Sequence, residues 1–157
     1  MRVDETDISG EFFTAAHAHW QDLCGPDRTF PYPQDLDPVS IPRRILPYSE
    51  LVDVLNSPLD FRYRLIGTAI DRISGSSYTG LSVRQIPSQA PPSRMFDFFA
   101  RAHERRTPFC AYLPYEGPDG YVESIRNLLL PFSEDGFAVS MFWSVVEIGR
   151  RQPKCTM

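Results

Sequence analysis

The chain has 157 residues, a formal net charge of -4 and a single lysine, Lys154. This length suits one domain with a core of its own, and the lack of a large positive field argues against nucleic acid or a membrane surface as a partner. Three widely spaced cysteines, Cys24, Cys110 and Cys155, indicate neither a disulfide framework nor a metal site. With no signal peptide or long apolar span recognisable, we expect a cytoplasmic protein.

The first predicted element is an amphipathic helix over residues 9–23. Ser9 is a candidate N-cap, and Gly25 followed by Pro26 would end the helix. Six prolines then fall between residues 26 and 47, and they exclude long regular elements there. A short helix over residues 37–44 is predicted within this stretch, because Asp37 suits an N-cap and Pro38 suits the first helical position.

Two strands are predicted next, over residues 50–55 and 59–66, joined as a hairpin by residues 56–58. Phe61, Tyr63 and Leu65 alternate with arginines, which is typical of a strand with one buried face. Gly67 follows, and we expect it to let the backbone turn where the alternation stops. A short helix over residues 69–74 should end at Gly75.

The second half of the chain predicts a longer helix and three strands. The helix spans residues 93–106, with a wide apolar stripe and an ion pair between Asp97 and Arg101. The strands cover residues 109–115, 121–132 and 137–148, and glycine-containing loops separate them. We therefore divide the chain into an N-terminal helix (1–25), one α+β domain (26–148) and a disordered polar tail (149–157).

Three short motifs resemble those of the PAS-like single-domain proteins of alphaproteobacteria. They are Phe-Arg-Tyr-Arg-Leu-Ile-Gly-Thr at residues 61–68, Thr-Gly at residues 79–80 and Leu-Leu-Leu-Pro-Phe-Ser at residues 128–133. The resemblance covers roughly residues 22–148, although Ser76-Ser77-Tyr78 stands where relatives usually have Gly-Arg. It implies an α+β fold with a PAS-like five-stranded antiparallel sheet, helices on one face and an added N-terminal amphipathic helix.

The same resemblance implies a stand-alone sensory or regulatory module of bacterial signalling, and not an enzyme. Its partners would be a small-molecule ligand, a signalling protein and a second copy of the chain. We expect the first helix to form the homodimer interface, or else to pack on the domain's own sheet. The candidate interface residues are Phe12, Phe13, Trp20 and Leu23.

A ligand pocket is expected where the longer helix faces the sheet, although the same aromatic side chains would also fill a plain core. The candidates are Tyr63, Phe96, Phe99, His103, Tyr112, Ser124, Arg126 and Trp143. Arg126 would bind an anionic ligand group if it points inward; alternatively it faces solvent or pairs with Glu123 or Glu147. The sequence does not identify a cofactor. Some PAS domains bind haem through a histidine on this helix, but His103 also suits a solvated helix end.

An enzyme on a similar α+β fold is the alternative function, although no nucleophile–base pair or phosphate-binding loop is recognisable. Such an enzyme would need a pocket group with a strongly shifted pKa, for example His103 beside Asp97 or Asp71. A protein-interaction module with a filled core is a further alternative. A pocket large enough for a ligand would argue against it.

Overall fold

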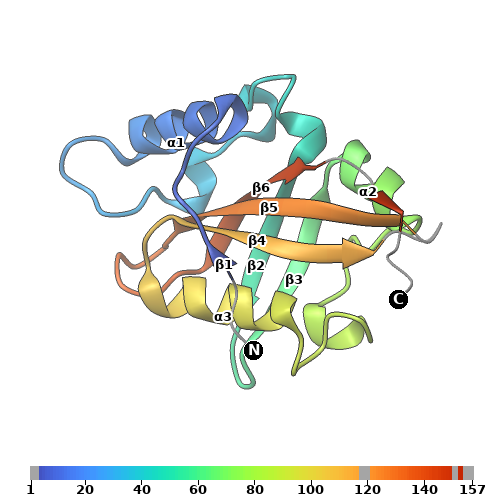
Figure 1. The fold of residues 1–157 in the computed structure, drawn as a ribbon. Helices are drawn as coiled ribbons and strands as arrows, with labels where there is room; N and C mark the ends of the chain where they lie inside the picture. Colours follow the sequence, from blue (N-terminus) through green and yellow to red (C-terminus); the bar gives the residue numbers. More distant parts are fainter. Residues whose placement is uncertain (1–3, 117–120, 150–151, 154–157) are drawn as a thin grey trace.

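The computed structural model describes residues 4–116, 121–149 and 152–153, with the side chains of residues 4–113 and 125–149. These residues form an α+β fold with three α-helices (Figure 1). In chain order the elements are β1 (Asp4–Glu5), α1 (Glu11–Cys24), β2 (Ser49–Leu55), β3 (Asp60–Ile66), α2 (Thr68–Ser74), α3 (Arg94–Arg105), β4 (Phe109–Glu116), β5 (Tyr121–Phe132), β6 (Met141–Ile148) and β7 (Gln152–Pro153). None of the described helices is long and apolar enough to cross a bilayer.

One antiparallel sheet organises the fold. Its strands follow the order β1-β4-β5-β6-β2-β3, and β7 pairs with β5 beside this path. The last long strand, β6, therefore lies next to β2 of the first hairpin. The prediction of five strands missed β1, a two-residue strand that pairs with Ala111 and Tyr112 at the free edge of β4. Two residues are too few for a periodic pattern.

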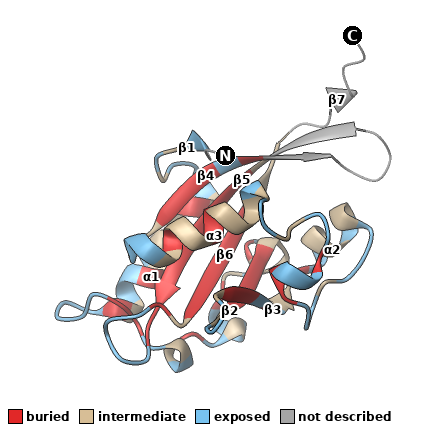
Figure 2. Ribbon diagram, turned by 90° about the horizontal axis from the view of Figure 1, so that it is seen from below, coloured by how far each residue is buried: buried red, intermediate tan, exposed pale blue. Residues whose placement is uncertain are grey.

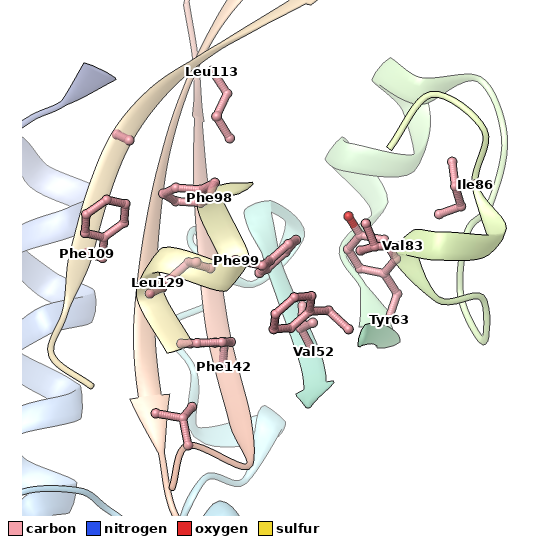
Figure 3. Close-up of a cluster of buried hydrophobic side chains, with 14 of the residues drawn as sticks. Val52, Tyr63, Val83, Ile86, Phe98, Phe99, Phe109, Leu113, Leu129 and Phe142 are labelled. Atoms are coloured by element: carbon pink, nitrogen blue, oxygen red, sulfur yellow. The ribbon is translucent and has the colours of Figure 1, made fainter. Parts of the chain in front are cut away.

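Each face of the sheet carries its own hydrophobic core, because α1 and α3 cover opposite faces (Figure 1). We call these the α1 core and the α3 core. Neighbouring residues of β6 alternate between them: Phe142 belongs to the α3 core and Trp143 to the α1 core. Figure 2 shows the buried residues concentrated in β4, β5 and β6. Figure 3 shows the α3 core, with Phe98 and Phe99 of α3 against the sheet.

Several local predictions are confirmed by helix caps and by one ion pair. The Ser93 hydroxyl accepts a bond from the Phe96 amide at 3.0 Å and caps α3. Asp37 likewise accepts from the Val39 amide at 3.0 Å, although only one turn of 3₁₀ helix follows, over Pro38–Ser40. Gly25 and Gly75 end α1 and α2, and Asp97 pairs with Arg101 at 2.8 Å.

Three local predictions were wrong or incomplete. The N-cap of α1 is Gly10, because Ser9 is engaged by Arg126 instead. The last long strand begins at Met141 because Asp135 accepts bonds from the amides of Phe137 and Ala138, which prolongs the turn and leaves Phe137 73% exposed. In the expected tail Gln152–Pro153 form β7, and residues 150–151 and 154–157 lie outside the described part of the chain.

Gly67 has a different role from the one expected. Its φ of -65° is open to any residue, so the turn itself does not require glycine. A Cβ atom at this position would lie 2.2 Å from the carbonyl oxygen of Pro47. The Gly67 amide also donates to the carbonyl of Ser49 at 2.8 Å. The motif glycine thus permits the chain before α2 to pack against the chain before β2.

A candidate ligand cavity beneath helix α2

A small cavity lies on the α3 side of the sheet, beneath α2 and the loop that follows it. Its volume is about 80 Å³. Ligand pockets commonly measure about 300–1,000 Å³, so only a very small molecule fits without movement of α2. The cavity is lined by Glu50, Tyr63, Ile66, Ile70, Ile73, Ser74, Tyr78, Gln89, Met95, Ile125, Asn127 and Val146.

Among the described residues of this lining, Glu50 supplies the one carboxyl group. It is the second residue of β2 and is only 7% exposed. Its Oε1 atom lies 2.9 Å from the Ser144 hydroxyl, which in turn lies 2.8 Å from Oδ1 of Asn127. The pairing of β2, β6 and β5 places these three side chains in a row across the sheet.

The hydrogen bonds of this row depend on the protonation of Glu50, since the Ser144 hydroxyl donates to the carboxylate when Glu50 is ionised. A serine hydroxyl has one proton and can donate to only one of two acceptors. When Glu50 carries a proton it can donate to Ser144, which then donates to Asn127, and both short contacts become hydrogen bonds. Burial raises the pKa of Glu50, the bond donated by Ser144 lowers it, and the nearby negative charge of Asp71 raises it; together they bring this pKa to about 7. Glu50 therefore titrates near neutral pH.

Tyr63 adds a fixed hydrogen-bond donor to the cavity. Its side chain is buried, and its hydroxyl donates to Oε1 of Gln89 at 2.6 Å. Burial, followed by the neighbouring Glu50 carboxylate, raises the pKa of Tyr63 well above its ordinary value, so the phenol stays neutral. Figure 3 shows Tyr63 beside Val83, at the α2 side of the core and away from Phe109.

The structure does not bring the predicted pocket residues together. Of the seven whose side chains the structure describes, only Tyr63 lines the cavity. Phe99 is fully buried in the α3 core, and Phe96 packs at its margin against Phe61. His103 is half-buried on α3, where burial lowers its pKa, but it does not line the cavity.

The remaining predicted pocket residues lie elsewhere. Trp143 and Arg126 are on the opposite face of the sheet, toward α1. Tyr112, on the same face of β4 as Cys110, is 46% exposed. The side chain of Ser124 lies outside the described residues.

Arg126 binds the N-terminal segment of its own chain. Its guanidinium donates to the Ser9 hydroxyl at 3.0 Å and to the Ser9 carbonyl at 2.5 Å, and it pairs with Glu147 at 3.0 Å. The Phe13 ring covers the guanidinium at 4.4 Å from the ring centroid. Pairing with Glu147 was one of the sequence-based alternatives. With these contacts Arg126 fixes the segment before α1 and is not available to the cavity.

Replacing Arg126 should release this segment. In Arg126→Met the Phe13 contact is largely kept, but the Ser9 carbonyl and Glu147 lose their donor, so we expect a loss of about 2–4 kcal/mol in unfolding free energy. Limited proteolysis should cut before residue 11 faster than in the native protein. Arg106→Met, at an exposed arginine, is the control. Unchanged proteolysis of Arg126→Met would refute the anchoring role.

The proposed interface residues of α1 are divided between the core and the surface. Phe13 and Trp20 are buried in the α1 core, and Trp20 Nε1 donates to the carbonyl of Pro131 at 2.8 Å. Phe12, which packs on Tyr48, and Leu23 are only partly buried. The alternative of packing on the domain's own sheet is therefore confirmed for Phe13 and Trp20, while the homodimer stays a prediction.

Sequence reasoning missed the polar residues of the cavity. Asn127 and Ser144 interrupt apolar runs, and this interruption is a signal of a buried polar site. Glu50 has no comparable signal, because its partner Ser144 lies 94 residues away. Within the described residues, no cluster of His, Cys, Asp and Glu side chains is suited to a metal ion.

Comparison with protein-family models and with curated proteins returns no match for the chain.

Proposed function

We propose that the protein is a PAS-like sensory or regulatory module whose input is a very small ligand held in the cavity beneath α2. One observation carries the proposal: a buried carboxyl group, Glu50, faces a cavity that the fold leaves beside its core. Pockets that combine apolar walls with a few convergent polar groups and a perturbed pKa are typical ligand sites.

Two of the three motifs that resemble the PAS-like family lie around this cavity. Tyr63, within the first motif, lines the cavity, and Gly67 and Thr68 of the same motif begin α2 above it. The Gly80 amide of the second motif donates to the Tyr63 carbonyl at 2.7 Å. The first motif thus lines the cavity and the second binds the backbone of the first, which supports a shared role in ligand binding.

The contacts around Glu50 offer a route from the cavity to α1. On the far face of the same two strands, the Ser49 hydroxyl accepts a bond from Trp143 Nε1 at 3.1 Å. Trp143 in turn contacts the His19 ring of α1, with ring centroids 5.8 Å apart. A ligand that moves Glu50 relative to Ser144 would shift β2 against β6 and reach α1 through Trp143. In this proposal α1 carries the signal to a protein partner or a second copy.

Native mass spectrometry of the protein purified from its own host tests ligand binding. We expect an excess mass that is lost from Ile70→Trp, because the larger side chain would fill the cavity from α2. Arg72→Trp, on the exposed side of the same helix, is the matched control and should keep the excess mass. A native protein of bare mass that also binds no small molecule in a fragment screen would contradict the proposal.

The pKa of Glu50 favours one second function, an enzyme that uses this carboxyl group as a general acid or base. The expected arrangement of His103 with Asp97 or Asp71 is not seen: His103 lies away from the cavity, and Asp97 pairs with Arg101. Conversion of the bound ligand to a product, with loss of conversion in Glu50→Gln, would favour the enzyme over the sensor.

A further inference from the structure

The cavity presents hydrogen-bond acceptors and a negative charge, and the described part of its lining holds no compensating cation. Its described lining contains one carboxyl group, two amides, two phenols and a serine among apolar residues, and none of these side chains is basic. Two of the potential donors are already used, since Tyr63 donates to Gln89 and the Ser74 hydroxyl donates to backbone carbonyls next to it. A ligand that supplies donors is therefore better matched than one that supplies acceptors.

Two acidic side chains at this site lack a partner of opposite charge among the described residues. Glu50 is nine-tenths buried, and its one hydrogen bond within the protein uses Oε1. Asp71 of α2 lies near enough to act on Glu50 electrostatically, and its own Oδ1 is buried without a hydrogen-bond partner. A buried carboxylate without a cation is costly, so a bound cation would relieve an unfavourable arrangement.

The walls and the size of the cavity indicate what kind of cation fits. Ile66, Ile73 and Val146 line it with apolar surface, which a bare metal ion would not use. Its volume of about 80 Å³ is roughly half of a cavity of about 150 Å³ known to hold benzene. A chain of about three or four heavy atoms is thus the largest rigid fit.

We propose that the cavity binds a small primary alkylammonium ion, with its ammonium group at Glu50 and its alkyl chain against the isoleucines of α2. This inference rests on the proposed ligand-binding function and names the chemical class of the ligand. The ammonium group would donate to the free oxygen of Glu50 and to Oδ1 of Asn127. Its charge would offset those of Glu50 and Asp71, and the methylene groups would replace poorly held water.

Three probes of similar size separate this proposal from other ligands: propylammonium, 1-propanol and acetate. We expect propylammonium to raise the melting temperature of the whole chain and to shift methyl NMR signals of residues that line the cavity. Acetate should have no effect, and 1-propanol should bind at least about tenfold more weakly than propylammonium. In Glu50→Gln the preference for propylammonium over 1-propanol should disappear. Glu134→Gln, at an exposed carboxyl group, should keep it.

The probe series gives a result even if Glu50→Gln does not fold, because it compares three ligands on the native protein. Equal or tighter binding of acetate or 1-propanol, or binding of none of the three, would overturn the alkylammonium proposal. If none binds but the purified protein carries another molecule that Ile70→Trp lacks, the cavity is still a ligand site and only the ligand class is wrong. If neither kind of ligand is found, the proposed function fails as well.

Discussion

Gly67→Ala should destabilise the protein by about 3 kcal/mol or more, the largest effect expected of adding a single methyl group. The new Cβ would lie 2.2 Å from the carbonyl oxygen and 2.5 Å from the carbonyl carbon of Pro47. Both are backbone atoms, so no side-chain rotation relieves the contact. The chain before β2 and the start of α2 would have to separate, and the bond from the Gly67 amide to Ser49 would weaken. Urea unfolding followed by tryptophan fluorescence measures this loss.

Gly25→Ala is the matched control for this experiment. Gly25 has a φ of +70° and a ψ of -177°, with nothing within 4 Å of its missing Cβ, so the substitution adds backbone strain without a steric clash. We expect it to cost about 1–3 kcal/mol, less than Gly67→Ala. If Gly67→Ala costs no more than Gly25→Ala, the close approach of residues 47 and 67 is not a constraint on the fold.

The example of Gly67 shows how far local sequence reasoning reaches. The motif and the end of the strand are visible in the sequence, and so is the helix that begins at Thr68. The physical reason for glycine is not, because it depends on Pro47, a residue in a different segment. The caps at Ser93 and Asp37 were predictable for the opposite reason: donor and acceptor lie within three residues of each other.

The position of the candidate site was less predictable than the fold. Alternation with arginines marks Tyr63 as buried, but Trp143 lies in an apolar strand, and the core that each side chain joins depends on the pairing of six strands. Because β5 and β6 are buried on both faces, alternation does not mark an inner side, and residues of both cores were assigned to one pocket. The row from Glu50 to Asn127 exists only once β2, β6 and β5 are paired.

Arg126 shows that the sequence also does not identify the partner of a buried charge. An arginine in an apolar strand correctly predicts a partner for its charge. The sequence does not choose between a ligand and Glu147, because this choice depends on which residue of a neighbouring strand lies opposite Arg126. The structure pairs it with Glu147 and with Ser9 of the segment before α1, and Ser9 lies 117 residues away in the chain.

Glu50 should make the protein less stable as the pH rises toward neutrality. Its pKa is raised from 4.5 to about 7 in the fold, so between these values the unfolded chain has released the proton that the native state still holds. Stability from this group is fully present below about pH 4.5 and is lost as the pH rises through about 7. The full change is about 3 kcal/mol. Glu50→Gln cannot ionise and should lack this loss.

Urea unfolding of the native protein and of Glu50→Gln, from about pH 4 to about pH 8, tests this expectation. The unfolding free energy of the variant, measured relative to that of the native protein, should rise by about 3 kcal/mol across this pH range. Most of the rise should be complete by about pH 7. Asp135→Asn provides a control of opposite sign, because the amides of Phe137 and Ala138 lower the pKa of Asp135; its deficit should be largest at neutral pH and shrink on acidification.

Parallel curves for Glu50→Gln and the native protein would mean that Glu50 has the same pKa in the fold as in the unfolded chain, with a cation or water reaching it. Glu50→Gln could be both more stable at neutral pH and unable to prefer propylammonium. In that case the native protein keeps a destabilising carboxyl group because the ligand needs it, which is the trade between stability and function expected of a binding site.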